Sequence, residues 1–176
     1  MSAWKRIDGI ARFLFTDSAL YVWCSGSDGW GDLWRNIDPR AEQVFPGAWV
    51  SSADIREARK VWRTVHSLAR GRHVHIIGFS RGAAVAVALA LWVSPDITRS
   101  LELYAPKRAA NRRALSELRH IEAHAQKGDV IPFLPPWLGQ VRIQWRGPWA
   151  WPWEAHKAMA KAAAKRRHEI GKRNGA

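Results

Sequence analysis

The sequence predicts an α/β fold in which a mostly parallel sheet is flanked by helices in a single domain. Short segments rich in β-branched and aromatic residues alternate with segments whose apolar residues recur at helical spacing. The 176 residues suit one domain with a hydrophobic core and are too few for two full ones. Charged residues make up 24% of the chain, which excludes a wholly disordered protein.

Two strands joined by a short polar turn open the chain, and helices then alternate with strands. Ser51 or Ser52 is a suitable N-cap for the first long helix, and Gly71 stops that helix. The helix behind the next strand is entirely apolar. The expected elements are strands over 9–15 and 19–24, a loop with one helical turn over 26–47, a helix that ends at 68, a strand over 73–79, a helix over 82–92, a strand over 100–104, a helix over 109–119, a strand over 120–125 and a helix over 153–170.

Residues 78–82, Gly-Phe-Ser-Arg-Gly, match the pattern G-x-S-x-G between the apolar strand and the apolar helix. In that context the pattern is typical of a nucleophile elbow, a sharp turn that holds a strained serine. Gly78 and Gly82 lack a Cβ, so the strand and the helix can approach each other closely. Ser80 is therefore the candidate nucleophile, and the alternative interpretation is an ordinary glycine-rich turn.

A nucleophilic serine needs a base, and the base needs an acid that orients it. In α/β-hydrolases the three follow in the order Ser, Asp or Glu, His. Asp96 is expected to be a loop or capping residue, whereas Asp129 follows the strand expected over 120–125, at the edge of the sheet. His156 comes 27 residues after Asp129, and His168 lies among the basic residues near the C-terminus. We therefore expect Ser80, Asp129 and His156 to form the catalytic triad.

Three further stretches accompany the elbow: VWCSGSDGWGDLWRNI before it, and LELYAPKRAANRR and HAQKGDVIPFLPP after it. With the elbow segment HVHIIGFSRGAAVAVALAL, and in this order, they resemble the class 3 lipases, the fungal-lipase-like branch of the α/β-hydrolases. The resemblance covers about residues 9–160 and implies a serine esterase or lipase that uses no cofactor and no metal. The sequence departs from the family pattern at Ser25 and Phe79, where the family usually has arginine and histidine.

The resemblance also implies a role for each residue of the site. Ser80 is expected to be the nucleophile, Asp129 the orienting acid and His156 the general base. The backbone N–H groups of Ser27 and Arg81 are expected to form the oxyanion hole. Cys24 is the only cysteine, which excludes an internal disulfide framework, and we expect it to pack as a small apolar residue.

The net charge of +13 builds toward the C-terminus, where residues 140–176 hold nine Lys or Arg against two Asp or Glu. Lys157, Lys161 and Lys165 recur every fourth residue and would line one helix face. Either this is a solvated helix, or it is attracted to an anionic surface such as phospholipid headgroups. No nucleic-acid-binding motif accompanies the charge. We expect one domain over 1–170, followed by a basic tail over 171–176.

Four of the 12 tryptophans, Trp145, Trp149, Trp151 and Trp153, directly precede the proposed base. They could pack a long loop, or they could form the wall of an acyl pocket or enter a lipid interface. Trp149, Trp151 and Trp153 are therefore candidate substrate-binding residues.

The leading hypothesis is a serine carboxylester hydrolase that acts on a small-molecule or lipid ester. The alternatives are a non-catalytic module that binds a membrane or polyanion through its basic, Trp-rich end, and a thioester hydrolase, amide hydrolase or acyltransferase on the same fold. The N-terminal segment has no unbroken apolar stretch, and the longest apolar run has 11 residues, too few to span a bilayer. The expected location is the cytoplasm, and the basic end leaves peripheral membrane association open.

Overall fold

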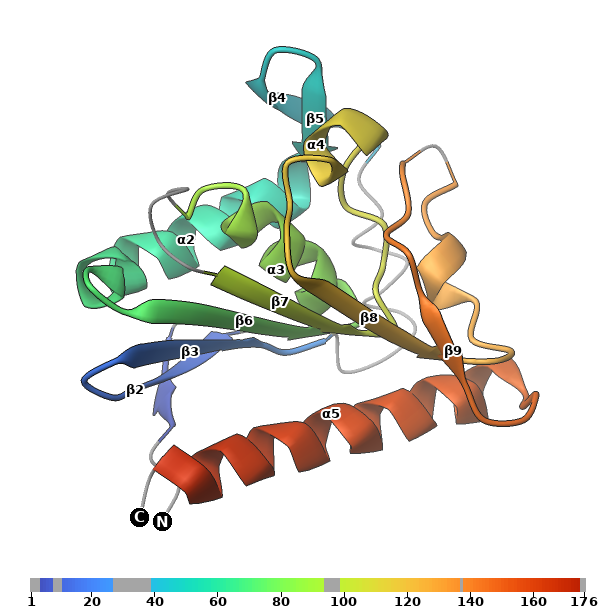
Figure 1. The fold of residues 1–176 in the computed structure, drawn as a ribbon. Helices are drawn as coiled ribbons and strands as arrows, with labels where there is room; N and C mark the ends of the chain where they lie inside the picture. The colour runs from blue at the N-terminus through green and yellow to red at the C-terminus, as the bar shows by residue number, and fades with distance from the viewer. Residues whose placement is uncertain (1–3, 8–10, 27–38, 94–98, 137, 175–176) are drawn as a thin grey trace.

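The computed structural model describes all residues except 1–3, 8–10, 27–38, 94–98, 137 and 175–176 (Figure 1). Its strands are β1 (Lys5–Arg6), β2 (Ala11–Phe15), β3 (Ala19–Cys24), β4 (Ala41–Phe45), β5 (Ala48–Ser51), β6 (His73–Phe79), β7 (Arg99–Tyr104), β8 (Ile121–Gln126) and β9 (Gln144–Arg146). Its helices are α2 (Ser52–Ala69), α3 (Arg81–Ala90), α4 (Arg112–Leu115), α5 (Pro152–Asn174) and the 3₁₀ turn η1 (Ile131–Phe133).

The described strands form a seven-stranded sheet in the order β1-β2-β3-β6-β7-β8-β9 and a separate hairpin of β4 and β5. From β3 to β9 the strands run parallel, and β1 and β2 extend one edge in antiparallel fashion. The C-terminal ends of the parallel strands therefore meet at one edge of the sheet. In open α/β sheets this edge is where ligands bind.

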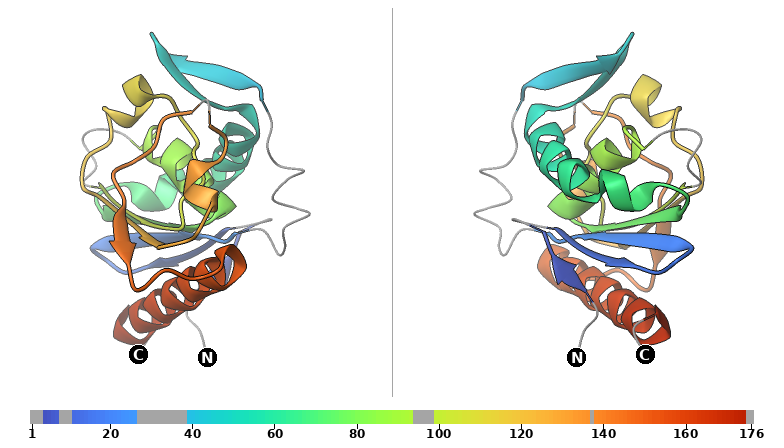
Figure 2. Two further views of the ribbon diagram at one scale, coloured as in Figure 1. Left: turned by 90° about the vertical axis from the view of Figure 1, so that its right-hand side faces the viewer. Right: turned by 90° about the vertical axis from the view of Figure 1, so that its left-hand side faces the viewer.

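Helices cover both faces of the sheet, and the two covers differ in extent (Figures 1 and 2). Helices α2 and α3 pack on one face, over a large apolar core that includes Val74 and Ile76 of β6. Helix α5 crosses the other face alone, over a smaller cluster that includes Ile77 of β6. The alternation along β6 sends successive side chains to opposite faces, which explains why both sides of this strand are buried.

The structure confirms the predicted fold class, a mostly parallel sheet flanked by helices in one compact domain. It corrects two of the expected elements. The loop expected over 26–47 holds strand β4, which pairs with β5, and residues 27–38 lie outside the described part of the chain. The helix expected over 109–119 is reduced to α4, because Ala109 and Ala110 are held by backbone contacts to Ser51 and Val50.

The last helix is longer than the spacing of its apolar residues predicts. Helix α5 begins at Pro152 and continues to Asn174, into the segment 171–176 that is expected to be a basic tail. Lys157, Lys161 and Lys165 are exposed along it. Within the described ranges, no helix is long and apolar enough to cross a membrane.

Candidate active site

Ser80 occupies the turn between β6 and α3 in a conformation that non-glycine residues rarely adopt, with φ 55° and ψ −121°. Hydrogen bonds hold this strained backbone in place. The Ser80 N–H donates to the Tyr104 carbonyl at 2.9 Å, and the Ser80 carbonyl accepts from the Ala83 N–H at 3.0 Å. A strained residue that its surroundings fix in this way is typical of a functional site.

The two glycines of the motif are required by close backbone contacts. A Cβ on Gly78 would lie 2.5 Å from the Ala83 Cα, and one on Gly82 would lie 2.2 Å from the Cys24 carbonyl oxygen. Neither contact could be relieved by moving a flexible side chain. The predicted strand–turn–helix arrangement of the elbow is therefore present, with the glycines where it requires them.

Asp129 and His156 form a buried acid–base pair, although 27 residues separate them in the sequence. Asp129 follows β8, at the edge of the sheet where the parallel strands end, and His156 lies in the first turns of α5. His156 Nδ1 lies 3.0 Å from Asp129 Oδ2, and the two residues are 8% and 1% exposed. The other carboxylate oxygen accepts from the Ile131 N–H at 2.9 Å. Because a carboxylate only accepts, Nδ1 is the donor of this hydrogen bond, which leaves Nε2 as the ring nitrogen that can accept a proton.

Aromatic contacts place this pair beside the elbow. Phe79, the residue before Ser80, has its ring centroid 4.9 Å from that of His156. Trp153 stacks on the same imidazole at 6.3 Å. The imidazole is therefore oriented by a carboxylate and two aromatic rings. The sequence marks Phe79 only as a departure from the family pattern, and its contact with His156 emerges from the fold.

Of the two expected oxyanion donors, Arg81 belongs to the described residues and Ser27 does not. Arg81 is the first residue of α3, so its backbone N–H is one of those that have no acceptor within the helix. Ser27 lies outside the described residues, as does Asp96.

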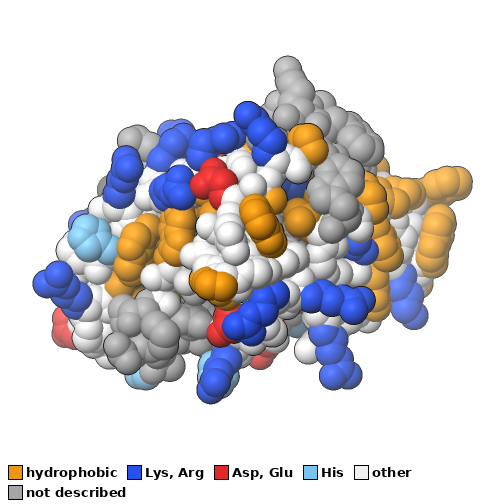
Figure 3. All heavy atoms as spheres, turned by 90° about the horizontal axis from the view of Figure 1, so that it is seen from above, with side chains coloured by type: hydrophobic (Ala, Val, Ile, Leu, Met, Phe, Trp, Pro, Cys, Tyr) orange, Lys and Arg blue, Asp and Glu red, His pale blue; other side chains and the backbone are white. Residues whose placement is uncertain are grey.

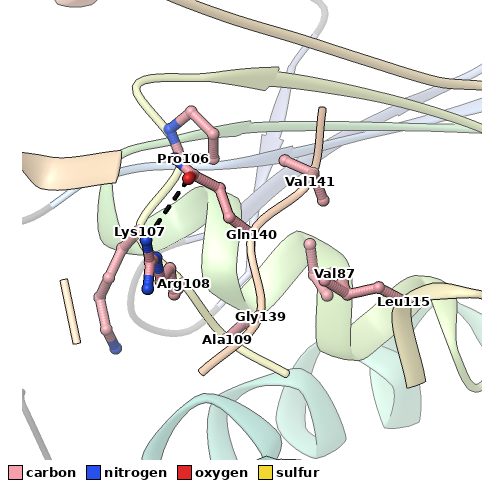
Figure 4. A pocket seen from close by; sticks show the side chains of 9 residues that line it. All are labelled: Val87, Pro106, Lys107, Arg108, Ala109, Leu115, Gly139, Gln140 and Val141. Atoms are coloured by element: carbon pink, nitrogen blue, oxygen red, sulfur yellow. Dashed lines mark hydrogen bonds between the residues drawn. The ribbon is translucent and has the colours of Figure 1, made fainter. Parts of the chain in front are cut away.

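Arg108 fastens the loop that carries Asp129. Its guanidinium donates to the carbonyl oxygens of Pro132 at 3.2 Å, Pro136 at 2.9 Å and Leu138 at 3.1 Å. It also reaches Gln140 Oε1 at 3.4 Å, beside a small pocket between the Arg108 segment and the end of this loop (Figure 4). One side chain thereby ties together both ends of the segment that follows Asp129. The sequence gives no sign of this role for Arg108, because nothing local indicates that its partners are main-chain oxygens.

A buried ion pair lies on the other side of the elbow. Lys107 Nζ is 2.8 Å from Asp54 Oδ2, and both side chains are at most 1% exposed. The Lys107 backbone N–H donates to the Ser80 carbonyl at 3.4 Å. The pair therefore links the first turn of α2 to the segment after β7 that contacts the elbow.

Three other side chains of reactive types are Cys24, His168 and His124. Cys24 is fully buried, and burial raises the pKa of its thiol to about 12, so it is unreactive at neutral pH. His168 is exposed on α5, and His124 is buried against Tyr104. Among the described residues there is no group of three His, Cys, Asp or Glu side chains that could hold a metal ion.

The three candidate substrate-binding tryptophans lie at one end of the molecule, before and at the start of α5. Trp153 contacts His156, as described above. Trp149 and Trp151 pack edge to face with ring centroids 5.9 Å apart. Their part in substrate binding stays a prediction.

No protein-family model and no curated protein matches the sequence. Solved structures of fungal lipases, however, share its fold. The triacylglyceride lipase of Rhizomucor miehei is 17% identical and aligns with a TM-score of 0.63, over 81% of this chain and 66% of its own. The lipase of Rhizopus microsporus var. chinensis is 19% identical, with a TM-score of 0.62 over 78% of this chain and 57% of its own. The mono- and diacylglycerol lipase of Aspergillus oryzae is 21% identical, with a TM-score of 0.62 over 80% and 59%.

The chain thus spans between 57% and 66% of the length of these three proteins. The alignments confirm the resemblance that the sequence motifs indicate. The protein has the fungal-lipase-like form of the α/β-hydrolase fold.

Proposed function

Because the chain folds as the fungal lipases do, we propose that it is a serine hydrolase that cleaves carboxylic ester bonds through Ser80, His156 and Asp129. The observation that carries the proposal is the buried hydrogen bond between His156 Nδ1 and Asp129 Oδ2, 3.0 Å long, beside a serine in a strained elbow. A histidine with a purely structural role needs neither an acidic partner nor a nucleophile elbow beside it. His156 has both, and it lies at the edge of the sheet where ligands bind.

In the proposed reaction, Ser80 Oγ attacks the ester carbonyl carbon while its proton passes to His156 Nε2. Asp129 stabilises the imidazolium that forms and remains ionised. The carbonyl oxygen becomes an oxyanion, which accepts hydrogen bonds from the backbone N–H groups of Arg81 and Ser27. The tetrahedral intermediate collapses, the C–O bond to the alcohol breaks, and the alcohol leaves with the proton from His156.

Water completes the cycle. His156 takes a proton from a water molecule as its oxygen attacks the acyl-enzyme, and the Ser80 Oγ–acyl bond then breaks to release the carboxylic acid. The serine recovers its proton from the imidazolium, and these steps use no cofactor. Trp149, Trp151 and Trp153 would contact the apolar part of the ester, because Trp153 borders the imidazole and the other two follow one another along the same loop.

Hydrolysis of p-nitrophenyl esters from acetate to palmitate tests this proposal. Ser80→Ala should lower kcat by about 10⁴- to 10⁶-fold, and Asp129→Asn and His156→Ala should fall to nearly the same level, because triad members act as a unit. The matched controls are His168→Ala, an exposed histidine on the same helix, and Asp17→Asn, an exposed aspartate in the β2–β3 turn. Both should stay close to wild type.

A Ser80→Ala variant that keeps more than about a tenth of wild-type turnover would rule out the elbow serine as nucleophile. The chain-length profile reports the substrate class, because a preference for long acyl chains is expected if the tryptophans contact the acyl group. The same series with thioester and amide analogues separates an ester hydrolase from the alternatives on this fold.

A further inference from the structure

Exposed aromatic side chains gather at the end of the molecule where β9 and the first turn of α5 lie. Six of the eight large apolar side chains that are exposed in the described part of the chain belong to this end. Trp149 and Trp151 are the most exposed of them, at 66% and 75%. We call this set the aromatic end, and its members are Val130, Phe133, Trp145, Trp149, Trp151 and Trp153.

Three separate segments build the aromatic end, and contacts hold them near one another. Phe133 of η1 stacks on Trp145 of β9, with ring centroids 5.8 Å apart. The loop with Trp149 and Trp151 packs against the loop that carries Asp129. A Cβ on Gly128 would lie only 1.9 Å from the Ala150 carbonyl oxygen. Figure 3 shows hydrophobic side chains protruding at this end of the molecule. A soluble monomer rarely exposes so many large aromatic side chains together without an interaction to make.

Cationic side chains accompany the aromatic ones. Lys157 Nζ lies 5.4 Å above the Trp153 ring, and Lys161 and Lys165 continue the exposed row along α5. The backbone of Lys127 is hydrogen-bonded to Arg146 and to Ala150, which lies between Trp149 and Trp151. Figure 3 shows Lys and Arg side chains beside the hydrophobic ones. Glu154, the acidic residue directly after Trp153, forms an ion pair with Lys157 at 2.9 Å.

We propose that the aromatic end and the lysine row of α5 dock the protein on an anionic phospholipid surface. Tryptophan is the side chain best suited to the boundary between headgroups and acyl chains, because its indole has an apolar body and a polar N–H. Lysines on a neighbouring face add Coulomb attraction to anionic headgroups. A nucleic-acid site would require rings arranged as a stacking platform, whereas Trp149 and Trp151 meet edge to face at 66°.

Docking in this orientation would place the ester-cleaving site at the lipid surface. Trp153 belongs to the aromatic end and also stacks on His156, so a lipid at this surface lies next to the base. That consequence rests on the proposed function. The docking itself does not, because it uses none of the triad residues.

Co-sedimentation with vesicles of phosphatidylcholine, with and without phosphatidylglycerol, tests the proposal on the full chain and on the Ser80→Ala variant. Both proteins should bind the anionic vesicles, and high salt should release them. Replacing Lys157, Lys161 and Lys165 by Gln should weaken binding by about tenfold or more, since three cations that attract the anionic headgroups are lost. The control replaces Arg63, an exposed cation of α2, and Arg70, the exposed residue directly after this helix, by Gln and should leave vesicle binding unchanged.

The aromatic contribution has its own pair of variants. Trp149→Ala with Trp151→Ala should weaken vesicle binding by about tenfold or more, because two inserted indoles are lost. Trp49→Ala removes a tryptophan that is 43% exposed on the β4–β5 hairpin, away from the aromatic end, and should bind as wild type does. Near-UV circular dichroism and thermal unfolding confirm that each variant is folded.

Three results would overturn the proposal. The wild-type protein does not sediment with vesicles, it binds neutral and anionic vesicles equally, or Trp49→Ala weakens vesicle binding as much as the Trp149–Trp151 double variant does. Salt-sensitive binding to heparin without binding to vesicles would overturn it as well. The lysine variant should keep wild-type turnover of a short soluble ester. Vesicle binding without any ester hydrolysis would refute the proposed function alone, and hydrolysis without vesicle binding would refute the docking alone.

Discussion

At the scale of single residues, a few neighbouring groups fix the geometry of the Asp129–His156 pair. One oxygen of Asp129 accepts from the Ile131 N–H and the other is hydrogen-bonded to His156, so the carboxylate cannot rotate freely. The imidazole in turn contacts Phe79 and Trp153. Groups that fix a catalytic geometry in this way contribute to rate without touching the reacting atoms.

Arg108 is such a positioning residue, because its guanidinium bonds to main-chain oxygens along the loop after Asp129. Arg108→Gln should lower the free energy of unfolding by about 2–4 kcal/mol and kcat by about 10- to 100-fold. Arg108→Lys should recover part of both, since an ammonium can reach some of these oxygens but cannot present the planar fork.

Urea unfolding and kcat on a short soluble ester measure the two effects of Arg108. Arg112→Gln, an exposed arginine on α4, is the matched control and should match wild type. If Arg108→Gln lowered stability while leaving kcat and its pH profile intact, Arg108 would have a structural role only.

The sequence selects candidate residues of the site more readily than it indicates the neighbours that contact them. Ser80, Asp129 and His156 can be selected because chain order and position at strand ends restrict the choice, and the structure brings Asp129 and His156 together. The contacts of Phe79 and Arg108 could not be predicted, because their partners are 24 or more residues away and have no matching side-chain chemistry.

At the scale of elements, the strands whose sides are both buried are the best predicted. The bounds expected for β3 and β6 agree with the structure, since β3 is an unbroken apolar run and β6 is rich in β-branched residues. The short strands β1 and β9 carry no such signal, because all their residues are exposed. Helix α4 is shorter than its sequence predicts. Contacts between β5 and the residues before α4 prevent the helix from starting earlier.

The ion pair between Lys107 and Asp54 links elements that are distant in the sequence, α2 and the segment after β7. Removing one partner leaves the other charge buried, so Lys107→Met or Asp54→Leu alone should cost about 3–5 kcal/mol of unfolding free energy. The double variant Lys107→Met, Asp54→Leu should recover most of that loss, because two apolar side chains leave no unpaired charge.

Urea unfolding of the full double-mutant cycle measures this coupling. Lys60→Met, which breaks the exposed pair with Glu57, is the control and should cost less than about 1 kcal/mol. Additive losses in the cycle would show that Lys107 and Asp54 act independently.

At the scale of the whole molecule, the two faces of the sheet differ in polarity. The face under α5 carries His75, Glu102, Tyr104 and His124, and Arg166 of α5 bonds to Glu102 with its Nε 2.9 Å from Oε2. One helix covers this face, whereas two pack on the apolar face. Polar side chains on the α5 side form hydrogen bonds with one another, as Tyr104 does with Glu102 and His75 with Ser100.

This polar face should make stability depend on pH. Burial, and then the nearby charge of Arg146, lower the pKa of His124, and burial with the charge of His73 lowers the pKa of His75. A histidine whose pKa is lowered in the folded state binds fewer protons there than when unfolded. Its contribution to stability is therefore present above the unfolded pKa of about 6.5 and is lost as the pH falls through the folded pKa.

We therefore expect the free energy of unfolding to fall between about pH 7 and pH 5, and His75→Gln with His124→Gln to reduce that slope. Urea unfolding across this range measures it, and His66→Gln, an exposed histidine on α2, is the control that should keep the wild-type slope. An unchanged slope in the double variant would contradict the assignment of the pH dependence to this face.

The central claim is that Ser80 is an activated nucleophile, and covalent labelling tests it most directly. A fluorophosphonate reacts with a serine only where a base and an oxyanion hole activate it. Intact-protein mass spectrometry should show one adduct on the wild type, and tryptic mapping should place it in the peptide 73–81, which holds Ser80. The Ser80→Ala variant should remain unlabelled. A wild type that stays unlabelled under conditions that label a known serine hydrolase, or an adduct that persists in Ser80→Ala, would contradict the account.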